Sequence, residues 1–196
     1  MGKAERTRQF IIEQAAPIFN EKGIAGTTIN DIMQATKMAK GGLYGHFESK
    51  DDMSVAIIDH LLSKLATKVS AVVAKEKTAR MKLFALLDFY RDPLDPYCQG
   101  GCPLVNFGVE ADDTNPAIRQ KIKERMLTTQ KYIAGIIKQG IADNEFRADF
   151  DADTFAIKMF AMIEGATIVC RILGDSSQMR TIISNLKAEV DAYKPA

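Results

Sequence analysis

The chain has 196 residues, of which 46% are hydrophobic and 26% charged, as in a soluble globular protein with one or two domains. The net charge of +1 gives no overall sign of nucleic-acid binding, so a DNA-binding protein of this composition must concentrate its cations on one face. The sequence has no run of about 18 apolar residues, so no membrane span is predicted. Three cysteines, an odd number, argue against a secreted disulfide fold. We therefore expect a cytoplasmic protein.

Residues 3–22 are predicted to form an amphipathic helix. Its inner stripe consists of apolar residues at helical spacing: Phe10, Ile11, Ala15, Ile18 and Phe19. Pro17 lies inside this pattern and predicts a local kink, and Gly23 is expected to end the helix. The cations near its beginning either reach phosphates or are only solvated: Lys3, Arg6 and Arg8.

Residues 27–50, TTINDIMQATKMAKGGLYGHFESK, predict two short helices, a tight turn between them and the start of a third helix. Thr28 and Asp31 have the spacing of a capping box at the start of the first helix. The second helix is expected to bury Met38, Leu43 and Phe47. Its outward residues suit contacts with phosphates and base edges: Lys40, Gly41, Gly42, Tyr44 and His46.

This pattern resembles the helix-turn-helix of the TetR/AcrR family of transcriptional regulators. The resemblance rests on these residues: Thr27, Thr28, Ile29, Asp31, Ile32, Lys40, Gly41, Leu43, Tyr44, His46, Phe47, Ser49 and Lys50. The family usually has glycine in the turn where this chain has Lys37, so we expect Lys37 to be left-handed or the turn to differ. The family often has Ser or Thr where Ala39 stands, so a helix cap is missing.

The DNA contacts that the resemblance implies fall on nine residues of this chain: Thr27, Thr28, Lys37, Lys40, Gly41, Gly42, Tyr44, His46 and Lys50. The function that it implies is a ligand-responsive regulator, in particular a repressor that leaves a palindromic double-stranded operator when a small-molecule effector binds. Neither a cofactor nor a membrane is expected to take part.

The remaining sequence predicts helices only, which gives an all-α fold of about nine helices. Ser49 with Asp52 starts a long helix, and the later helices cover roughly residues 78–90, 103–110, 116–141, 151–173 and 176–193. We predict a DNA-binding domain at residues 1–48 and a ligand-binding and dimerisation domain at residues 49–196. The last two helices carry excess apolar residues, so we expect a homodimer there, with Val169 and Ile183 as interface candidates.

The aromatic and methionine residues of the second half have two interpretations. Most are expected to form an ordinary helical core. The resemblance implies that some line an effector cavity, and we name as candidates Phe84, Phe107, Met126 and Phe160.

Three alternatives remain open. Cys98 and Cys102 lie four residues apart before a helix start, so they are either passive loop residues or reactive thiols that sense electrophiles or oxidants. A protein-interaction module without DNA affinity and a helical enzyme or carrier are the other two. No catalytic motif surrounds Cys102 or His60 and no metal-site spacing occurs, so an enzyme is not expected.

Overall fold

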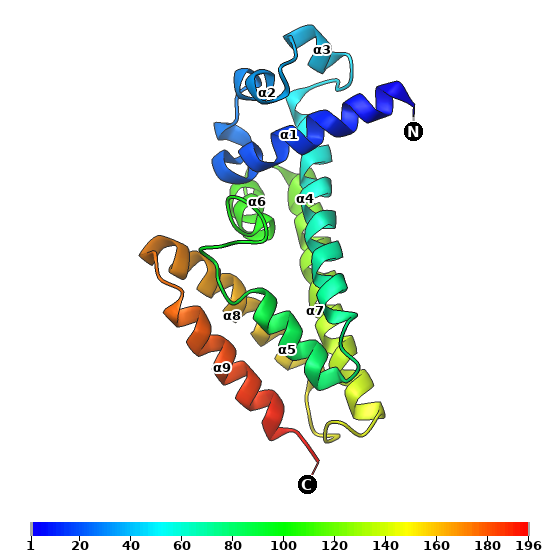
Figure 1. Ribbon diagram of the computed structural model, residues 1–196, viewed down its shortest axis with the longest axis vertical. Helices are drawn as coiled ribbons and strands as arrows, with labels where there is room; N and C mark the ends of the chain where they lie inside the picture. Colours follow the sequence, from blue (N-terminus) through cyan, green and yellow to red (C-terminus); the bar gives the residue numbers. More distant parts are fainter. Residues whose placement is uncertain (1, 196) are drawn as a thin grey trace. The chain divides into compact units, whose positions relative to one another are not determined.

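The computed structural model describes residues 2–195, and these residues form nine α-helices and no strand (Figure 1). The predicted all-α fold is therefore confirmed. The helices are α1 (Lys3–Gly26), α2 (Ile29–Thr36), α3 (Lys40–Tyr44), α4 (Lys50–Val73), α5 (Ala79–Phe89), α6 (Pro103–Ala111), α7 (Pro116–Ala142), α8 (Ala152–Leu173) and α9 (Ser177–Ala192). Within the described residues, no helix is both long enough and apolar enough to cross a membrane.

Several helices begin or end at residues with clear local signals. Thr78 accepts a hydrogen bond from the Met81 backbone N–H at the start of α5, and Asp151 does the same for Thr154 at the start of α8. Pro103 occupies the first turn of α6. Gly174 ends α8 in the left-handed conformation, with φ of 68°.

The chain folds into two compact units. Unit 1 contains the chain up to Leu65 together with Tyr97–Ile122, and unit 2 contains Ala66–Pro96 and the chain from Lys123 onward. The long helices α4 and α7 each begin in unit 1 and end in unit 2. Helix α6 thus belongs to the same compact unit as the N-terminal helices. The predicted boundary between the DNA-binding domain and the ligand-binding domain, at residues 48 and 49, concerns function and stays a prediction.

In unit 1, α1 packs against α2 and α6 around a buried apolar core. Its fully buried large side chains are Ile11, Phe19, Ile32, Leu43, Met53, Ile57, Ile58, Phe107 and Ile118. One prediction about α1 is wrong. Phe10 is exposed, because it lies outside the stripe that Ile11, Ile12 and Ala15 turn to the core. The helical conformation is interrupted at Gly23, with φ of 75° and ψ of 174°, where the sequence predicted the helix to end, and helical residues continue beyond it to Gly26. The kink at Pro17 stays a prediction.

In unit 2, α9 packs against both α8 and α5 (Figure 1). Four aromatic rings pack together: Phe146 and Phe155 meet Phe150 edge to face, and Tyr193 stacks on Phe150 with ring centroids 4.0 Å apart. Ile183 is buried in this core, where it faces other helices of the same chain. Its prediction as an interface residue is therefore wrong.

Gly140 marks a close approach between α7 and its neighbours, and it gives a paired prediction. A Cβ atom there would lie 2.6 Å from the Ala79 Cβ and 2.5 Å from a ring carbon of Phe146. We expect Gly140→Ala to lower the free energy of unfolding by about 1–3 kcal/mol through overpacking. Gly135 lies on the same helix and has no such neighbour within 4 Å, so Gly135→Ala should raise it by up to about 1 kcal/mol.

Urea unfolding of the two variants measures both effects. Equal stability changes in the two variants would contradict the close approach at Gly140.

Candidate nucleic-acid interface

The start of α2 is fixed by a capping box. Thr28 Oγ1 accepts from the Asp31 backbone N–H (3.1 Å), and Asp31 Oδ2 accepts from the Thr28 backbone N–H (2.8 Å), as predicted. Lys22 Nζ donates to the other oxygen of Asp31 at 2.7 Å. These bonds, with that of Lys22 first and those of Thr28 next, lower the pKa of Asp31 to about 2. The carboxylate therefore contributes stability above its ordinary pKa of 3.8, and this contribution is lost as the pH falls towards 2.

The turn between α2 and α3 depends on Lys37. Lys37 has φ of 56° and ψ of 27°, so the left-handed conformation predicted for it is confirmed. Buried Thr36 donates its hydroxyl to the Ile32 carbonyl at 2.7 Å and closes the end of α2. The turn keeps the geometry that glycine would permit without strain, and it leaves the Lys37 side chain exposed.

Helix α3 is five residues long and holds a single buried side chain, Leu43. Lys40, Gly41, Gly42 and Tyr44 are exposed, and His46 just beyond the helix is half-buried. Ala39 at the N-cap makes no side-chain cap, as expected from its missing hydroxyl. A helix this short is not stable alone, so Leu43 and Phe47 hold it in place by packing.

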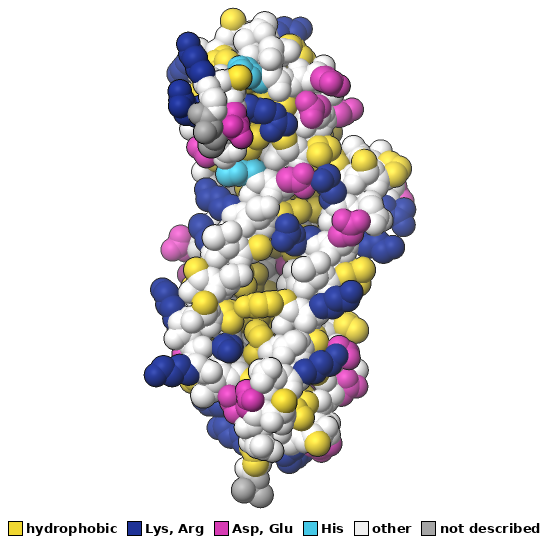
Figure 2. Space-filling model, turned by 90° about the vertical axis from the view of Figure 1, so that its right-hand side faces the viewer, with side chains coloured by type: hydrophobic (Ala, Val, Ile, Leu, Met, Phe, Trp, Pro, Cys, Tyr) yellow, Lys and Arg dark blue, Asp and Glu magenta, His cyan; other side chains and the backbone are white. Residues whose placement is uncertain are grey.

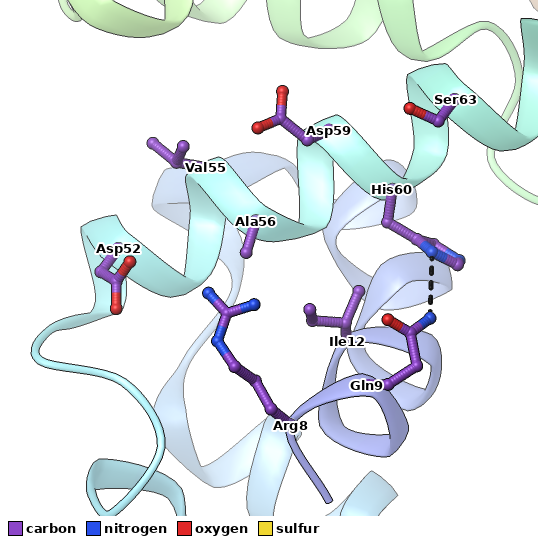
Figure 3. A pocket seen from close by; sticks show the side chains of 9 residues that line it. All are labelled: Arg8, Gln9, Ile12, Asp52, Val55, Ala56, Asp59, His60 and Ser63. Carbon is purple, nitrogen blue, oxygen red and sulfur yellow. Dashed lines mark hydrogen bonds between the residues drawn. The ribbon is translucent and has the colours of Figure 1, made fainter. Parts of the chain in front are cut away.

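Phe47 also packs against a cation. The Arg8 guanidinium of α1 lies 4.6 Å from the centre of the Phe47 ring. Arg8 also lines a pocket of about 400 Å³ between α1 and α4, where its guanidinium points towards Ala56 (Figure 3). Arg8 is thus tied to the packing of α3, whereas Lys3 is simply exposed.

His60 belongs to the same pocket and has a packing role. Its Nδ1 lies 3.5 Å from Gln9 Nε2 (Figure 3). Burial, and then the charge of Lys64, lower the pKa of His60 against the opposing charge of Glu13. Among residues 2–195, no group of three or more His, Cys, Asp or Glu side chains is placed to hold a metal ion.

Charge does not mark the interface by itself. Lys and Arg side chains alternate with Asp and Glu over the face shown in Figure 2, in keeping with the net charge of +1. The exposed residues of α3 indicate the interface instead, because they combine a cation, a phenol and two glycines, whose missing side chains let another molecule approach the backbone.

Three further predicted contact residues lie outside α3, and two of them, Thr27 and Thr28, have structural tasks. Thr27 is fully buried and donates its hydroxyl to the Gly23 carbonyl at 2.6 Å, so its side chain does not face a partner as predicted. Thr28 is exposed and serves the capping box. Lys50 begins α4 and is half-buried, beside a Ser49 hydroxyl that accepts from the Asp52 backbone N–H at 3.1 Å.

Comparison with known proteins decides the family. Residues 11–57 match the model of bacterial regulatory proteins of the tetR family, and residues 79–186 match the tetracyclin repressor-like C-terminal domain. The crystal structure of a TetR-family transcriptional regulator from Cytophaga hutchinsonii is 35% identical to this chain. It has a TM-score of 0.95 and covers 100% of this chain and 98% of its own. The chain belongs to the TetR family.

Two further relatives of this TetR-family protein carry functional names. The transcriptional repressor DhaR of Mycobacterium sp. (strain GP1) is 24% identical over 84% of this chain and 82% of its own length. The transcriptional regulator TtgR of Pseudomonas putida is 27% identical over 89% of this chain and 84% of its own length. The TetR-family protein described here is therefore a helix-turn-helix transcriptional regulator, with α2 and α3 inside the matched N-terminal segment.

The four predicted effector-cavity residues of this TetR-family regulator do not all lie in one compact unit. Phe107 is fully buried in unit 1, whereas Phe84, Met126 and Phe160 belong to unit 2. Two cations lie close to the Phe84 ring, with Arg80 at 4.1 Å and Lys187 at 5.0 Å from its centre. A cavity within unit 2 could therefore use at most three of the four, and their role stays a prediction.

Both loop thiols of this regulator are buried, Cys98 with 6% and Cys102 with 2% of its surface exposed. The backbone around them is part of a compact turn, because Gly101 N–H donates to the Cys98 carbonyl at 3.0 Å. Burial limits access for electrophiles, so the reactive-thiol alternative stays a prediction without support from exposure.

The sequence resemblance extends to Asn106 and Glu110 without assigning them a role, and it does not include Asn20, yet all three residues make hydrogen bonds near the break in α1 of this TetR-family chain. The available signals were a polar residue inside the apolar stripe of the first helix and a carboxylate at the end of a short apolar helix.

Lys37 supplies a test of the turn that separates strain from charge. We expect Lys37→Gly to raise the stability by about 1 kcal/mol, because glycine adopts the left-handed conformation without steric cost. Lys37→Ala removes the same charge but keeps a Cβ atom, so its stability should not rise. Thermal unfolding of both variants measures the difference, and equal melting temperatures would show that the left-handed Lys37 carries no cost.

Proposed function

We propose that this regulator is a repressor that binds a palindromic operator as a homodimer and is released by a small-molecule effector. The observation that carries this proposal is the surface of α3, which exposes Lys40, Gly41, Gly42 and Tyr44 while Leu43 anchors it. The name of the relative DhaR, a transcriptional repressor, supports the same function. Such a regulator acts without enzymatic chemistry, in the cytoplasm where the chromosome lies.

Each exposed residue of α3 suits a different contact with DNA. Gly41 has nothing within 4 Å of the position a Cβ atom would take, so the backbone itself can approach the major groove. Lys40 is early in the helix and suits a guanine edge or a phosphate. The Tyr44 hydroxyl, Lys37 and Lys50 suit phosphates, which fix the register of the helix on the duplex.

The dimer is inferred from a bare apolar stripe on α8. Ile157, Ala161, Gly165, Ile168 and Ile172 recur every three or four residues, and all are exposed. Ile172 keeps 79% of its surface exposed, and no atom lies within 4 Å of a Cβ placed on Gly165. Small residues in mid-stripe allow close helix contact, so a second copy of α8 fits this stripe better than water does.

The effector is proposed to act by shifting populations between two states of the dimer. A palindrome presents two half-sites one helical turn apart, and both recognition helices must match successive major grooves. An effector that binds more tightly to a dimer with another spacing releases DNA. Its site is proposed in unit 2, with Phe84, Met126 and Phe160 as candidates.

Selection of bound duplexes from random DNA by the purified protein tests the function. We expect a palindromic consensus, and affinity that falls with added salt because cations contact phosphates. Enrichment of no sequence, together with salt-independent binding to a protein partner, would favour an interaction module instead.

Two variants locate the interface on the selected duplex. Lys50→Ala should weaken binding to all sequences about equally and lower the salt slope by about one unit. Lys75→Ala, in unit 2, removes the same charge and should keep the wild-type slope. Tyr44→Phe should weaken binding through the lost hydroxyl, and identical titrations for all four proteins would remove Lys50 and Tyr44 from the interface.

The dimer is tested by Ile172→Glu, which places a charge in the α8 stripe. We expect the dimer mass of the wild type to fall to the monomer mass in light scattering at micromolar concentration. Leu127→Glu changes another exposed apolar residue, on α7, and should stay dimeric. A monomeric wild type would contradict both the dimer and the palindromic operator.

A further inference from the structure

The break in α1 leaves backbone groups that a continuous helix would pair with one another. In an unbroken helix the Ile24 N–H would donate to the Asn20 carbonyl, and the Ala25 N–H to the Glu21 carbonyl. Gly23, with φ of 75° and ψ of 174°, turns the chain away and separates these partners. Buried or partly buried backbone groups need substitutes.

The substitutes come from α6. Glu110 accepts from the Ile24 N–H with Oε2 (2.7 Å) and from the Ala25 N–H with Oε1 (2.6 Å). Asn106 Nδ2 donates to the separated Asn20 carbonyl at 2.9 Å. We call Asn106 and Glu110 the α6 clamp, because together they satisfy both sides of the broken pair.

The loop before α6 fixes the clamp against α1. The Asn20 side chain is only 2% exposed. Its Nδ2 donates to the carbonyls of Gln99 (2.6 Å) and Gly101 (2.9 Å), and its Oδ1 accepts from Asn106 Nδ2 (3.1 Å). Gly100 approaches so closely that a Cβ atom there would lie 2.8 Å from the Asn20 carbonyl carbon and oxygen. The clamp is therefore a built contact that tolerates little displacement.

The residues after the break lead directly into the helix-turn-helix. Buried Thr27 bonds back to the Gly23 carbonyl, and Lys22 reaches Asp31 in the first turn of α2. The direction that the chain takes at Gly23 thus sets where α2 starts. A continuous α1 would carry residues 24–27 along the helix axis and move the start of α2.

We propose that the break at Gly23 is a two-state element that the α6 clamp holds in the broken form required for operator binding. When α6 withdraws, the Ile24 N–H and the Asn20 carbonyl can pair with each other, so α1 becomes continuous and the recognition helix moves. Asn106 and Glu110 are positioning residues that act on DNA through α1 and α2. The operator part of this inference rests on the proposed function, whereas the state of the break does not.

The test reaches the continuous state by two routes. Asn106→Ala combined with Glu110→Gln removes the donor to Asn20 and leaves one acceptor oxygen for two N–H groups. Gly23→Ala keeps the clamp residues but disfavours a positive φ, and its Cβ would lie 2.7 Å from Glu110 Oε2. Glu21→Gln is the control, because it removes one negative charge beside the same loop without touching the broken pair.

Residue 23 is the one position of α1 with non-helical φ and ψ, so its carbon-13 Cα chemical shift in the full-length protein reports the break without DNA, and thermal melting verifies that each variant is folded. Both routes should give helical shifts and about tenfold weaker binding to the selected duplex, a typical coupling. The salt slope should stay at the wild-type value because no phosphate contact is lost. Glu21→Gln should match the wild type in shifts and affinity.

The proposal is overturned if either route leaves residue 23 non-helical, or if its shift becomes helical while operator affinity stays at the wild-type value. If the wild type selects no duplex, the proposed function fails, and the chemical shifts alone then decide whether the clamp holds the break.

Discussion

The structure of unit 1 depends on backbone groups that the first helix cannot pair by itself. A break in mid-helix leaves N–H and C=O groups that cost free energy unless other partners bind them. Asn106 and Glu110 meet this requirement, and the bonds to Glu110 are charge-assisted and short. Together with the burial of Phe107, these bonds join α6, which follows α5 of unit 2 in the chain, to the N-terminal helices.

The helix-turn-helix combines strong local signals with weak intrinsic helix stability. The capping box of Thr28 and Asp31 and the left-handed Lys37 fix both ends of α2. Helix α3 has two glycines in five residues, so its own preference for helix is low. Leu43 and Phe47 compensate by burial, and Arg8 stacks on Phe47. Small outward residues that favour DNA approach are thus tolerated because the inner side is well packed.

Unit 2 shows how one helix can serve two surfaces. One side of α8 buries Phe155, Met159, Ile163 and Cys170 against the core, while Ile168 and Ile172 remain exposed. The ion pairs of Arg80 with Asp191 and of Lys187 with Asp88 join α9 to α5. Helix α8 therefore has more apolar surface than its own chain buries, which is the physical basis of the proposed dimer.

The sequence by itself determined the helices, their caps and the DNA-binding motif, because these depend on residues three or four positions apart. Thr28 with Asp31, Lys37, Leu43 and Gly174 behave as their local patterns predict. Only the tertiary structure decided the rest, because it depends on contacts between residues distant in sequence. It buried Thr27 and Ile183, placed Phe107 in unit 1 and brought Asn106 and Glu110 to the break at Gly23. A periodic pattern shows which side of a helix is apolar but not which helix covers it.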